Sequence, residues 1–320
     1  MTGRARFEYD LLCMGRSSID LYAHEIGVPI TAVKSFDAYV GGCPTNVSVG
    51  TRRLGLRSAL LTAVGDDQVG EFVLHFLDTE GVETRFIPRK AGRRTSAVVL
   101  TIQPPDRFPL TFYRDNCADI ALTVADVDAS PIASSRFVFL SGTGLSLEPS
   151  RTATRHAAAR GRDGGAGVIV DLDYRADQWP SAQEYARNVQ DLLGYAALAV
   201  GTEEEAVAAA AGAGIEAAIE AVMNTGVPAF VLKRGARGST VVRRDGSRAD
   251  VQPFHVEVLN VLGAGDAFAS GLIYGLREGW SLEEAARFGN AVGAIVVTRH
   301  GCANFMPTLV EVQQFIERHD

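Results

Sequence analysis

The chain has 320 residues, of which 47% are hydrophobic and 22% are charged, and its formal net charge is −7. This composition is ordinary for a globular protein with a sizeable core, and the acidic balance argues against a nucleic-acid partner. No apolar run approaches the length of a membrane helix. The N-terminal residues lack the apolar core of a signal peptide, so we expect a cytoplasmic protein.

In chain order, short apolar segments rich in β-branched residues alternate with longer amphipathic segments. The short segments predict strands at residues 10–14, 59–63, 137–140, 167–171, 197–200, 229–233 and 240–243. The longer segments predict helices at residues 44–54, 68–80, 151–161, 181–193, 202–211, 214–225, 265–278, 281–298 and 309–318. This alternation is typical of a parallel sheet that helices cover on both faces.

Two segments break the alternation, one at about residues 17–40 and one at about residues 95–116. Both have the composition of strands without an intervening helix, and Pro104, Pro105 and Asp106 suit a hairpin turn in the second. We expect the two segments to pair as a small separate sheet. The predicted division is a main domain of residues 1–16, 41–94 and 119–320, and a β lid of residues 17–40 and 95–118.

The segment Gly263-Ala264-Gly265-Asp266 lies at the start of a predicted helix. Small residues allow a ligand to approach the backbone closely, and the free N–H groups of a helix start favour an anion. An aspartate beside a bound phosphate can accept the proton of an attacking hydroxyl. The alternative is that Asp266 only caps the helix.

Two other glycine segments suit ligand contacts. Gly41 and Gly42 precede a predicted helix start, and Asn46 falls in its first turn, where an amide can bind sugar hydroxyls. A predicted strand ending at Lys233 runs into a turn with Gly235 and Gly238, against which a nucleotide could lie. Each segment alone suits a plain turn equally well.

Together, in this order and spacing, the motifs resemble those of the ribokinase-like (PfkB) family of carbohydrate kinases, and the resemblance extends from residue 10 to about residue 307. It implies an α/β fold, a three-layer α/β/α sandwich with a mainly parallel central sheet and a small β-sheet lid. It also implies ATP-dependent phosphorylation of a sugar hydroxyl, Mg²⁺, K⁺ in many members, and a homodimer formed through the lid. Residues 13–27, 41–46 and 104–119 are most similar to family members that phosphorylate 5-dehydro-2-deoxygluconate in myo-inositol catabolism.

The resemblance also implies a role for individual residues. Asp266 would be the catalytic base, with Gly263, Ala264 and Gly265 as the anion hole. The other implied contacts are Ser18, Asp20, Gly41, Gly42, Asn46 and Glu148 for the sugar, Lys233, Gly235, Gly238 and Asn290 for the nucleotide, Glu204 for Mg²⁺ through water, and Asn260 for a monovalent cation. The sequence departs from the family at Asn260, where Asp is common, and at Gly201, where the magnesium motif usually begins with Asn.

A sugar acid needs a cation for its carboxylate, and a guanidinium fits one well. Arg107 and Arg114 lie in the predicted lid, and Arg16 precedes Asp20. We expect Arg107 and Arg114 to bind the substrate. The alternative is that these arginines are solvated or paired with nearby acids such as Asp115.

Two other functions remain open from the sequence. One is a kinase for 2-keto-3-deoxygluconate, fructose or another sugar. The other is a non-catalytic protein that binds a sugar or nucleotide, which Gly201 and Asn260 favour faintly and which the intact Asp266 argues against.

Overall fold

The framework of the molecule is an eight-stranded sheet with the strand order β14-β13-β12-β11-β10-β9-β1-β4. The computed structural model describes residues 7–103 and 107–319. The strands are β1 (Tyr9–Met14), β4 (Ser58–Leu61), β9 (Ser135–Ser141), β10 (Gly167–Asp171), β11 (Leu198–Thr202), β12 (Ala229–Lys233), β13 (Ser239–Arg243) and β14 (Arg248–Val251). The six strands β4, β1, β9, β10, β11 and β12 run parallel. At one edge β13 is antiparallel to β12, and β14 is antiparallel to β13.

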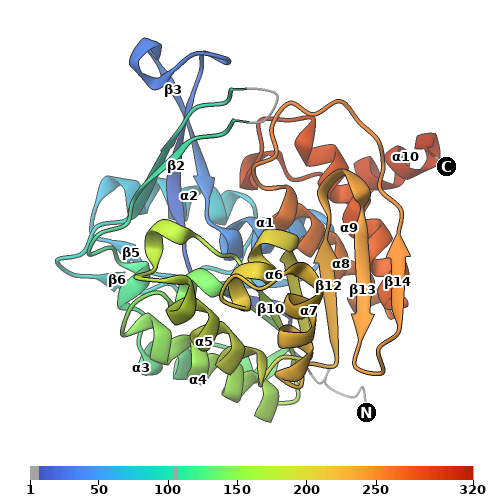
Figure 1. Ribbon diagram of the computed structural model, residues 1–320. Coiled ribbons are helices and arrows are strands. Elements are labelled where there is room, and N and C mark those ends of the chain that lie inside the picture. Colours follow the sequence, from blue (N-terminus) through green and yellow to red (C-terminus); the bar gives the residue numbers. More distant parts are fainter. Residues whose placement is uncertain (1–6, 104–106, 320) are drawn as a thin grey trace, which may run out of the picture.

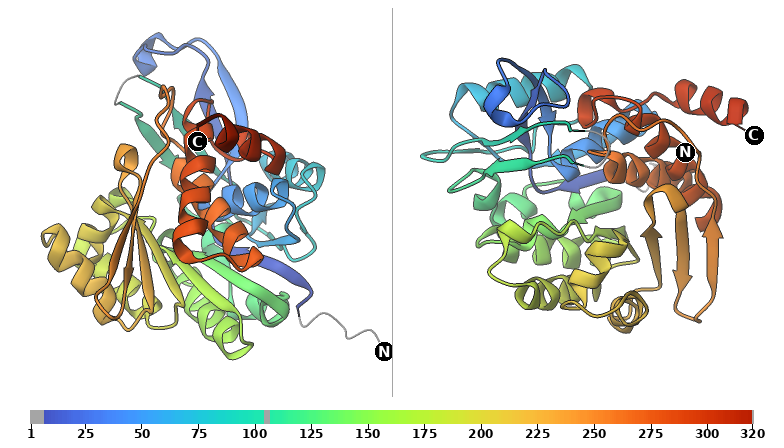
Figure 2. Two further views of the ribbon diagram at one scale, coloured as in Figure 1. Left: turned by 90° about the vertical axis from the view of Figure 1, so that its right-hand side faces the viewer. Right: turned by 45° about the horizontal axis from the view of Figure 1, so that its top comes forward.

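Helices cover both faces of this sheet, which confirms the predicted three-layer fold (Figures 1 and 2). Side chains alternate between two cores, so Leu11 packs on one face and Leu12 on the other. One face carries α1 (Cys43–Arg53), α2 (Gln68–Thr79), α8 (Ala264–Glu278) and α9 (Leu282–Val297). The other carries α3 (Val124–Asp128), α4 (Ser150–Asp163), α5 (Ala182–Leu193), α6 (Glu203–Ala209) and α7 (Ile215–Asn224). The last helix, α10 (Leu309–His319), packs on α9.

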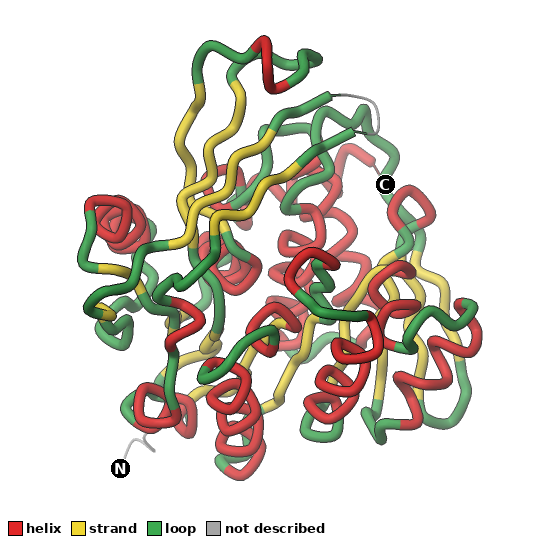
Figure 3. The backbone as a smooth tube through the Cα atoms, turned by 60° about the vertical axis from the view of Figure 1, so that its left-hand side comes forward, coloured by secondary structure: helices red, strands yellow, loops and turns green. Residues whose placement is uncertain are grey.

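A separate four-stranded sheet, here called the small sheet, projects from this body (Figure 3). Its order is β3 (Phe36–Gly41), β2 (Ser18–Ala23), β7 (Ser96–Leu100) and β8 (Leu110–Tyr113). The two irregular segments therefore pair with each other, as the sequence predicts. The predicted turn at 104–106 lies outside the described residues. A short pair, β5 (Val64–Gly65) and β6 (Arg89–Lys90), lies beside α2.

No helix within residues 7–103 and 107–319 is long and apolar enough to cross a membrane.

Glycines let α8 pack closely against α9. A Cβ atom on Gly271 would lie 2.9 Å from the Cα of Gly289, and a Cβ on Gly289 would lie 2.8 Å from the carbonyl oxygen of Phe268. Because both obstacles are backbone atoms, the helices could not keep this separation with larger residues. The contact fixes α8, whose first turn carries Asp266.

We predict that Gly271→Ala lowers the free energy of unfolding by about 1–3 kcal/mol, the usual cost of overpacking a close contact. Urea denaturation measures the change. Gly194→Ala is the control, because Gly194 has φ −60° and its Cβ would meet only the Asp191 carbonyl at 3.4 Å. The control should stay within about 1 kcal/mol of the unchanged protein. Equal losses in both variants would contradict the close packing.

Candidate active site

A narrow cavity of about 50 Å³ lies between the carboxyl ends of the main-sheet strands and the inner face of the small sheet. Its walls come from the small sheet, from the segments that follow β1 and β10, from the starts of α1 and α8, and from the loop before α10. The lining residues are Arg16, Asp20, Tyr22, Gly42, Cys43, Asn46, Val98, Leu100, Leu110, Phe112, Arg175, Leu262, Gly263, Asp266 and Cys302. In open α/β sheets this edge is where ligands bind.

The start of α8 is built as an anion site with a carboxylate beside it. Gly263, the N-cap, has φ +79°, and its Cβ would lie 2.6 Å from the backbone nitrogen of Cys302, so only glycine fits. The first turn exposes N–H groups that have no intrahelical partner and that favour a negative charge. Asp266 is the third residue of the helix.

The Asp266 carboxylate is oriented by residues from α1. Asn46 Nδ2 donates to Asp266 Oδ2 at 2.6 Å, and the Cys43 thiol also interacts with this carboxylate. Burial raises the pKa of Asp266, and the neighbouring Asp173 carboxylate adds to the rise. Asn46 Oδ1 is buried without a partner in the described residues, so it can accept a hydrogen bond from a ligand hydroxyl. The pair suits proton removal from a bound alcohol.

Asp20 lies at the wall formed by the small sheet. Ser18 Oγ donates to Asp20 Oδ1 at 2.6 Å, and Arg16 Nη1 donates to Ser18 Oγ at 2.8 Å. A Cβ on Gly41 would lie 1.9 Å from Asp20 Oδ2, and one on Gly42 would lie 2.3 Å from the Arg16 carbonyl oxygen. The two glycines are therefore needed to bring α1 against the Asp20 strand. A carboxylate and an amide at this wall can bind sugar hydroxyls.

A buried charge cluster lies next to the first turn of α8. Lys233 Nζ is 3.0 Å from Asp171 Oδ2 and 3.8 Å from Glu205 Oε2. A Cβ on Gly265 would lie 3.1 Å from the same Nζ, so the ammonium faces the predicted anion hole. Burial and the neighbouring carboxylates raise the pKa of Asp171, and the paired carboxylates raise that of Lys233.

The other residues predicted to contact a nucleotide lie near β13 and β14. Gly235 has φ +56°, and no atom lies within 4 Å of the position that a Cβ would take there. Gly238 has φ +78°, and its Cβ would lie 2.2 Å from the Val251 carbonyl. Asn290 Nδ2 on α9 donates to the carbonyls of Val251 and Gln252. The side chain thus holds the chain that follows β14.

Five predicted substrate residues do not line the cavity. Ser18 and Gly41 contact Asp20 and so lie next to its wall, and the other three are Glu148, Arg107 and Arg114. Glu148 is exposed, and its Oε2 accepts from the backbone N–H of Thr152. Arg107 is also exposed. Arg114 is buried, and its guanidinium is bound to Asp119 at 2.6 Å with further bonds to the Thr143 carbonyl, Ser146 and Gln178.

The acidic helix start after β11 presents a different residue from the one predicted. Glu204 is exposed, whereas Glu205 lies beside Lys233 and forms a capping box with Thr202. The Thr-x-x-Glu spacing of a capping box was the available sequence signal. Gly201 leaves no room for an asparagine, because its Cβ would lie 2.5 Å from Leu172 Cδ1.

Asn260 is fully buried and holds two loops together. Its Oδ1 accepts from the Leu262 N–H at 3.0 Å, and its Nδ2 donates to the His300 carbonyl at 2.5 Å.

Sequence reasoning missed Arg175, Asp171 and Cys43 as site residues. Polar residues that follow buried parallel strands were the signal for the first two.

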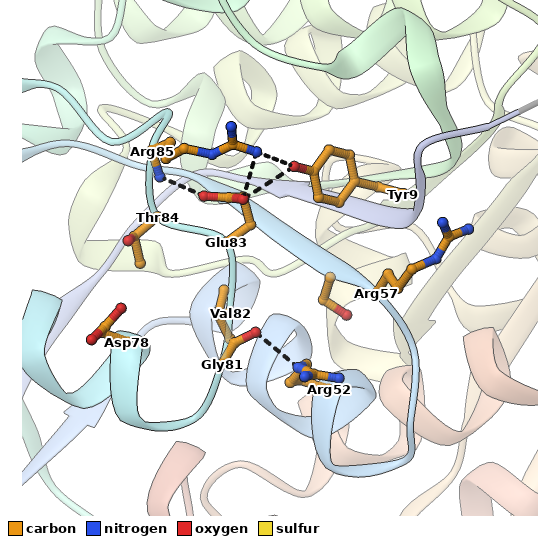
Figure 4. Close-up of a pocket in the computed structure, with 10 residues that line it drawn as sticks. Tyr9, Arg52, Arg57, Asp78, Gly81, Val82, Glu83, Thr84 and Arg85 are labelled. Carbon is orange, nitrogen blue, oxygen red and sulfur yellow. Dashed lines mark hydrogen bonds and ion pairs between the residues drawn. The ribbon is translucent and has the colours of Figure 1, made fainter.

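A larger cavity of about 430 Å³ lies elsewhere on the surface and shares no lining residue with the site (Figure 4). Its polar groups are largely satisfied by one another. Arg85 pairs with Glu83 at 2.8 Å and also donates to Tyr9, while Arg52 donates to the Gly81 carbonyl. Size alone therefore does not make it the active site.

Comparison with known proteins identifies relatives that match along almost the whole chain. Residues 9–309 match the model of the pfkB family carbohydrate kinases. A protein of Shouchella clausii named 5-dehydro-2-deoxygluconokinase is 32% identical over 97% of this chain and 96% of its own length. The protein of the same name from Geobacillus kaustophilus is 34% identical over 97% and 94%.

Solved structures agree with this match. A fructokinase double mutant from Vibrio cholerae O395, with fructose, ADP and potassium ion bound, has a TM-score of 0.86 and 27% identity, covering 98% of this chain and 99% of that one. Fructokinase from Xylella fastidiosa with bound ATP has a TM-score of 0.87 and 25% identity, covering 96% and 98%. With its fold, its helix-start anion site and its carboxylate, the chain belongs to the pfkB family of carbohydrate kinases and is an ATP-dependent sugar kinase.

Proposed function

We propose that the protein transfers the γ-phosphoryl group of ATP to the 6-hydroxyl of 5-dehydro-2-deoxy-D-gluconate in myo-inositol catabolism. The relatives that share about a third of its residues over nearly full length carry the name of this activity. The observation that carries the proposal is a narrow cavity lined by two carboxylates, Asp20 and Asp266, and by the buried Arg16, which has no ion-pair partner within 4 Å in the described residues. Asp266 suits a free hydroxyl, and the guanidinium of Arg16 suits the carboxylate of an acidic sugar.

In the proposed mechanism Asp266 accepts the proton of the sugar hydroxyl as that oxygen attacks the γ-phosphorus. Asn46 holds the carboxylate and offers its free Oδ1 to the sugar, while Asp20 and Ser18 bind other hydroxyls. The N–H groups at the start of α8 would stabilise the charge on the transferring group. Positioning and charge stabilisation account for most of the rate in such reactions.

ATP would lie along the ends of β11, β12 and β13, with Lys233 toward the phosphates and Gly235, Gly238 and Asn290 at the nucleoside. In the described part of the chain, no three His, Cys, Asp or Glu side chains converge as a metal site. Mg²⁺ would therefore be held mainly by phosphates and water. Glu205 fits the water-mediated contact better than Glu204, because Glu205 faces the site.

Asn260 offers less to a monovalent cation than the usual aspartate, since it is neutral and its oxygen already accepts from Leu262. We therefore propose only weak activation by K⁺. A rate that falls more than about tenfold on replacing K⁺ with a large organic cation would contradict this.

The small sheet would act as the lid, with residues 17–40 and 95–118 as one domain and the rest of the chain as the other. The cavity is narrow and the small sheet forms one of its walls, so movement of this lid would admit the sugar. The face turned away from the cavity carries Leu21, Val99 and Tyr113, and Tyr113 is 59% exposed. This apolar face suits a homodimer, and light scattering that gives a monomer mass would contradict it.

A cytoplasmic location fits the four cysteines, which are all unpaired and buried. Localisation of a tagged chain outside the cytoplasm would contradict it.

We expect strong ADP release with Mg-ATP and 5-dehydro-2-deoxygluconate, and weak release with 2-keto-3-deoxygluconate, fructose, ribose and adenosine. A coupled assay over this panel measures each kcat/KM. Highest kcat/KM with any other member would reject the proposed substrate. Turnover limited to fructose would instead favour the activity for which the Vibrio cholerae neighbour is named.

We expect Asp266→Asn to lower kcat about 10²–10⁴-fold, because the base is lost while the hydrogen bond to Asn46 can persist. Asp191→Asn is the control, since Asp191 is an exposed acid that pairs with Arg155 at the surface. The control should keep its kcat. Near-normal turnover by Asp266→Asn would remove Asp266 as the base.

The raised pKa of Asp266 predicts a pH profile. A base works only when it is ionised, so kcat/KM for the sugar should rise with pH through a limb displaced above the ordinary aspartate value of 3.8. Residual activity of Asp266→Asn should lack this limb. The same limb in both proteins would assign it to another group.

A further inference from the structure

Arg16 is a buried cation in the wall of the cavity. It lies in the connection between β1 and β2, and only 7% of its surface is exposed. Its guanidinium lies over the ring of Phe112 with 5.2 Å between the guanidinium carbon and the ring centroid. Arg16 Nη1 donates to Ser18 Oγ at 2.8 Å, while Nε is buried and has no partner in the described residues.

The charge of Arg16 is not matched by an ion pair. Within residues 7–103 and 107–319, no carboxylate oxygen lies within 4 Å of its guanidinium nitrogens, although Asp20 and Asp173 are near enough for the charge of Arg16 to favour their ionised forms. The other arginines near the site are paired, Arg114 with Asp119 at 2.6 Å and Arg175 with Asp173 at 3.1 Å. A buried charge without a partner is costly, and so is a buried N–H without an acceptor. Both costs fall when an anion binds.

The position of Arg16 distinguishes between the two anions that the reaction supplies. Its neighbours Ser18, Asp20 and Phe112 all belong to the small sheet. The cationic group on the nucleotide side is Lys233, next to Gly265. We therefore assign an anion that reaches Arg16 to the sugar and not to the nucleotide.

We propose that Arg16 is the residue that selects a sugar acid, by binding the substrate carboxylate through its unpaired guanidinium N–H groups. This rests on the proposed function, in which the acid carries its carboxylate at C1 and its reacting hydroxyl at C6. Arg16 then holds one end of the carbon chain and Asp266 the other. The planar guanidinium gives two parallel hydrogen bonds to a carboxylate, and the Phe112 ring holds its plane in place.

A rival role for Arg16 is purely structural. Through Ser18 it could position Asp20, which would affect every sugar in the same way. The two roles therefore differ in one measurable quantity, the ratio of kcat/KM for an acid to that for a neutral sugar. This ratio does not depend on the fraction of folded enzyme, so partial misfolding of a variant leaves it interpretable.

The experiment measures kcat/KM at saturating Mg-ATP for the unchanged protein, Arg16→Gln, Arg16→Lys and Ser18→Ala. The acid is 5-dehydro-2-deoxygluconate, and the neutral sugar is fructose. If fructose turns over too slowly, the ratio of its competitive inhibition constant to the KM of the acid replaces the first ratio, because neither constant depends on the folded fraction. Arg16→Gln should lower the acid-to-fructose ratio at least about 100-fold, with the KM for ATP unchanged, because a buried charge-assisted contact is lost. Arg16→Lys should lower the ratio about tenfold, since charge remains without the fork.

Ser18→Ala is the matched control, because it breaks the same link to Asp20 but keeps the guanidinium and its contact with the Phe112 ring. Ser18→Ala should lower kcat/KM for the acid and for fructose by the same factor. An unchanged ratio in Arg16→Gln would overturn the proposal and leave the sugar-acid kinase assignment standing. If the unchanged protein used 2-keto-3-deoxygluconate instead, the proposed substrate would fail, and the same ratio measured with that acid would decide the role of Arg16. A preference of the unchanged protein for fructose over both acids would overturn both proposals.

Discussion

The hydrogen bond from Asn46 to Asp266 joins the first turns of two helices that are 220 residues apart in sequence. The bond forms only because the chain approaches itself unusually closely on both sides. Gly41 and Gly42 bring α1 against Asp20 and the Arg16 carbonyl, and Gly263 takes a left-handed conformation against Cys302. Any side chain at these positions would separate the carboxylate from the amide that orients it.

Periodicity predicted nearly every element of the main sheet, because its strands are buried on both faces and its helices are amphipathic. Among the main-sheet strands and the α-helices, two elements were missed for physical reasons. The edge strand β14 has the sequence Arg-Ala-Asp-Val, which contains no apolar run. Its hydrogen bonds to the antiparallel strand β13 hold it in the sheet, so it does not need one. Helix α3 has five residues, too few to show a period. The glycine motifs could be recognised because close contact between backbone segments requires glycine, which is visible in the sequence.

The parts of the site that sequence could not place depend on which face of an element points inward. Glu204 and Glu205 are adjacent and chemically alike, and only the helix direction set by the capping box decides which one meets Lys233. Arg114 and Arg16 differ in the same way. Asp119 forms a close ion pair with Arg114, whereas no acid within the described residues lies within 4 Å of the Arg16 guanidinium nitrogens. Which acid pairs with each arginine depends on the fold, so the sequence alone could not predict it.

The location of Arg16 has a mechanical consequence. Residues 15–17 connect β1 of the main sheet to β2 of the small sheet, so Arg16 lies at one of the connections between the two bodies. The tip of the small sheet, near the turn Ile30–Ala32, is far along the strand from this connection. A small rotation at residues 15–17 would therefore move the tip of the small sheet farther than it moves Arg16. Arg16, the residue proposed to bind the substrate carboxylate, thus lies where a small movement of the backbone would change the position of the small sheet.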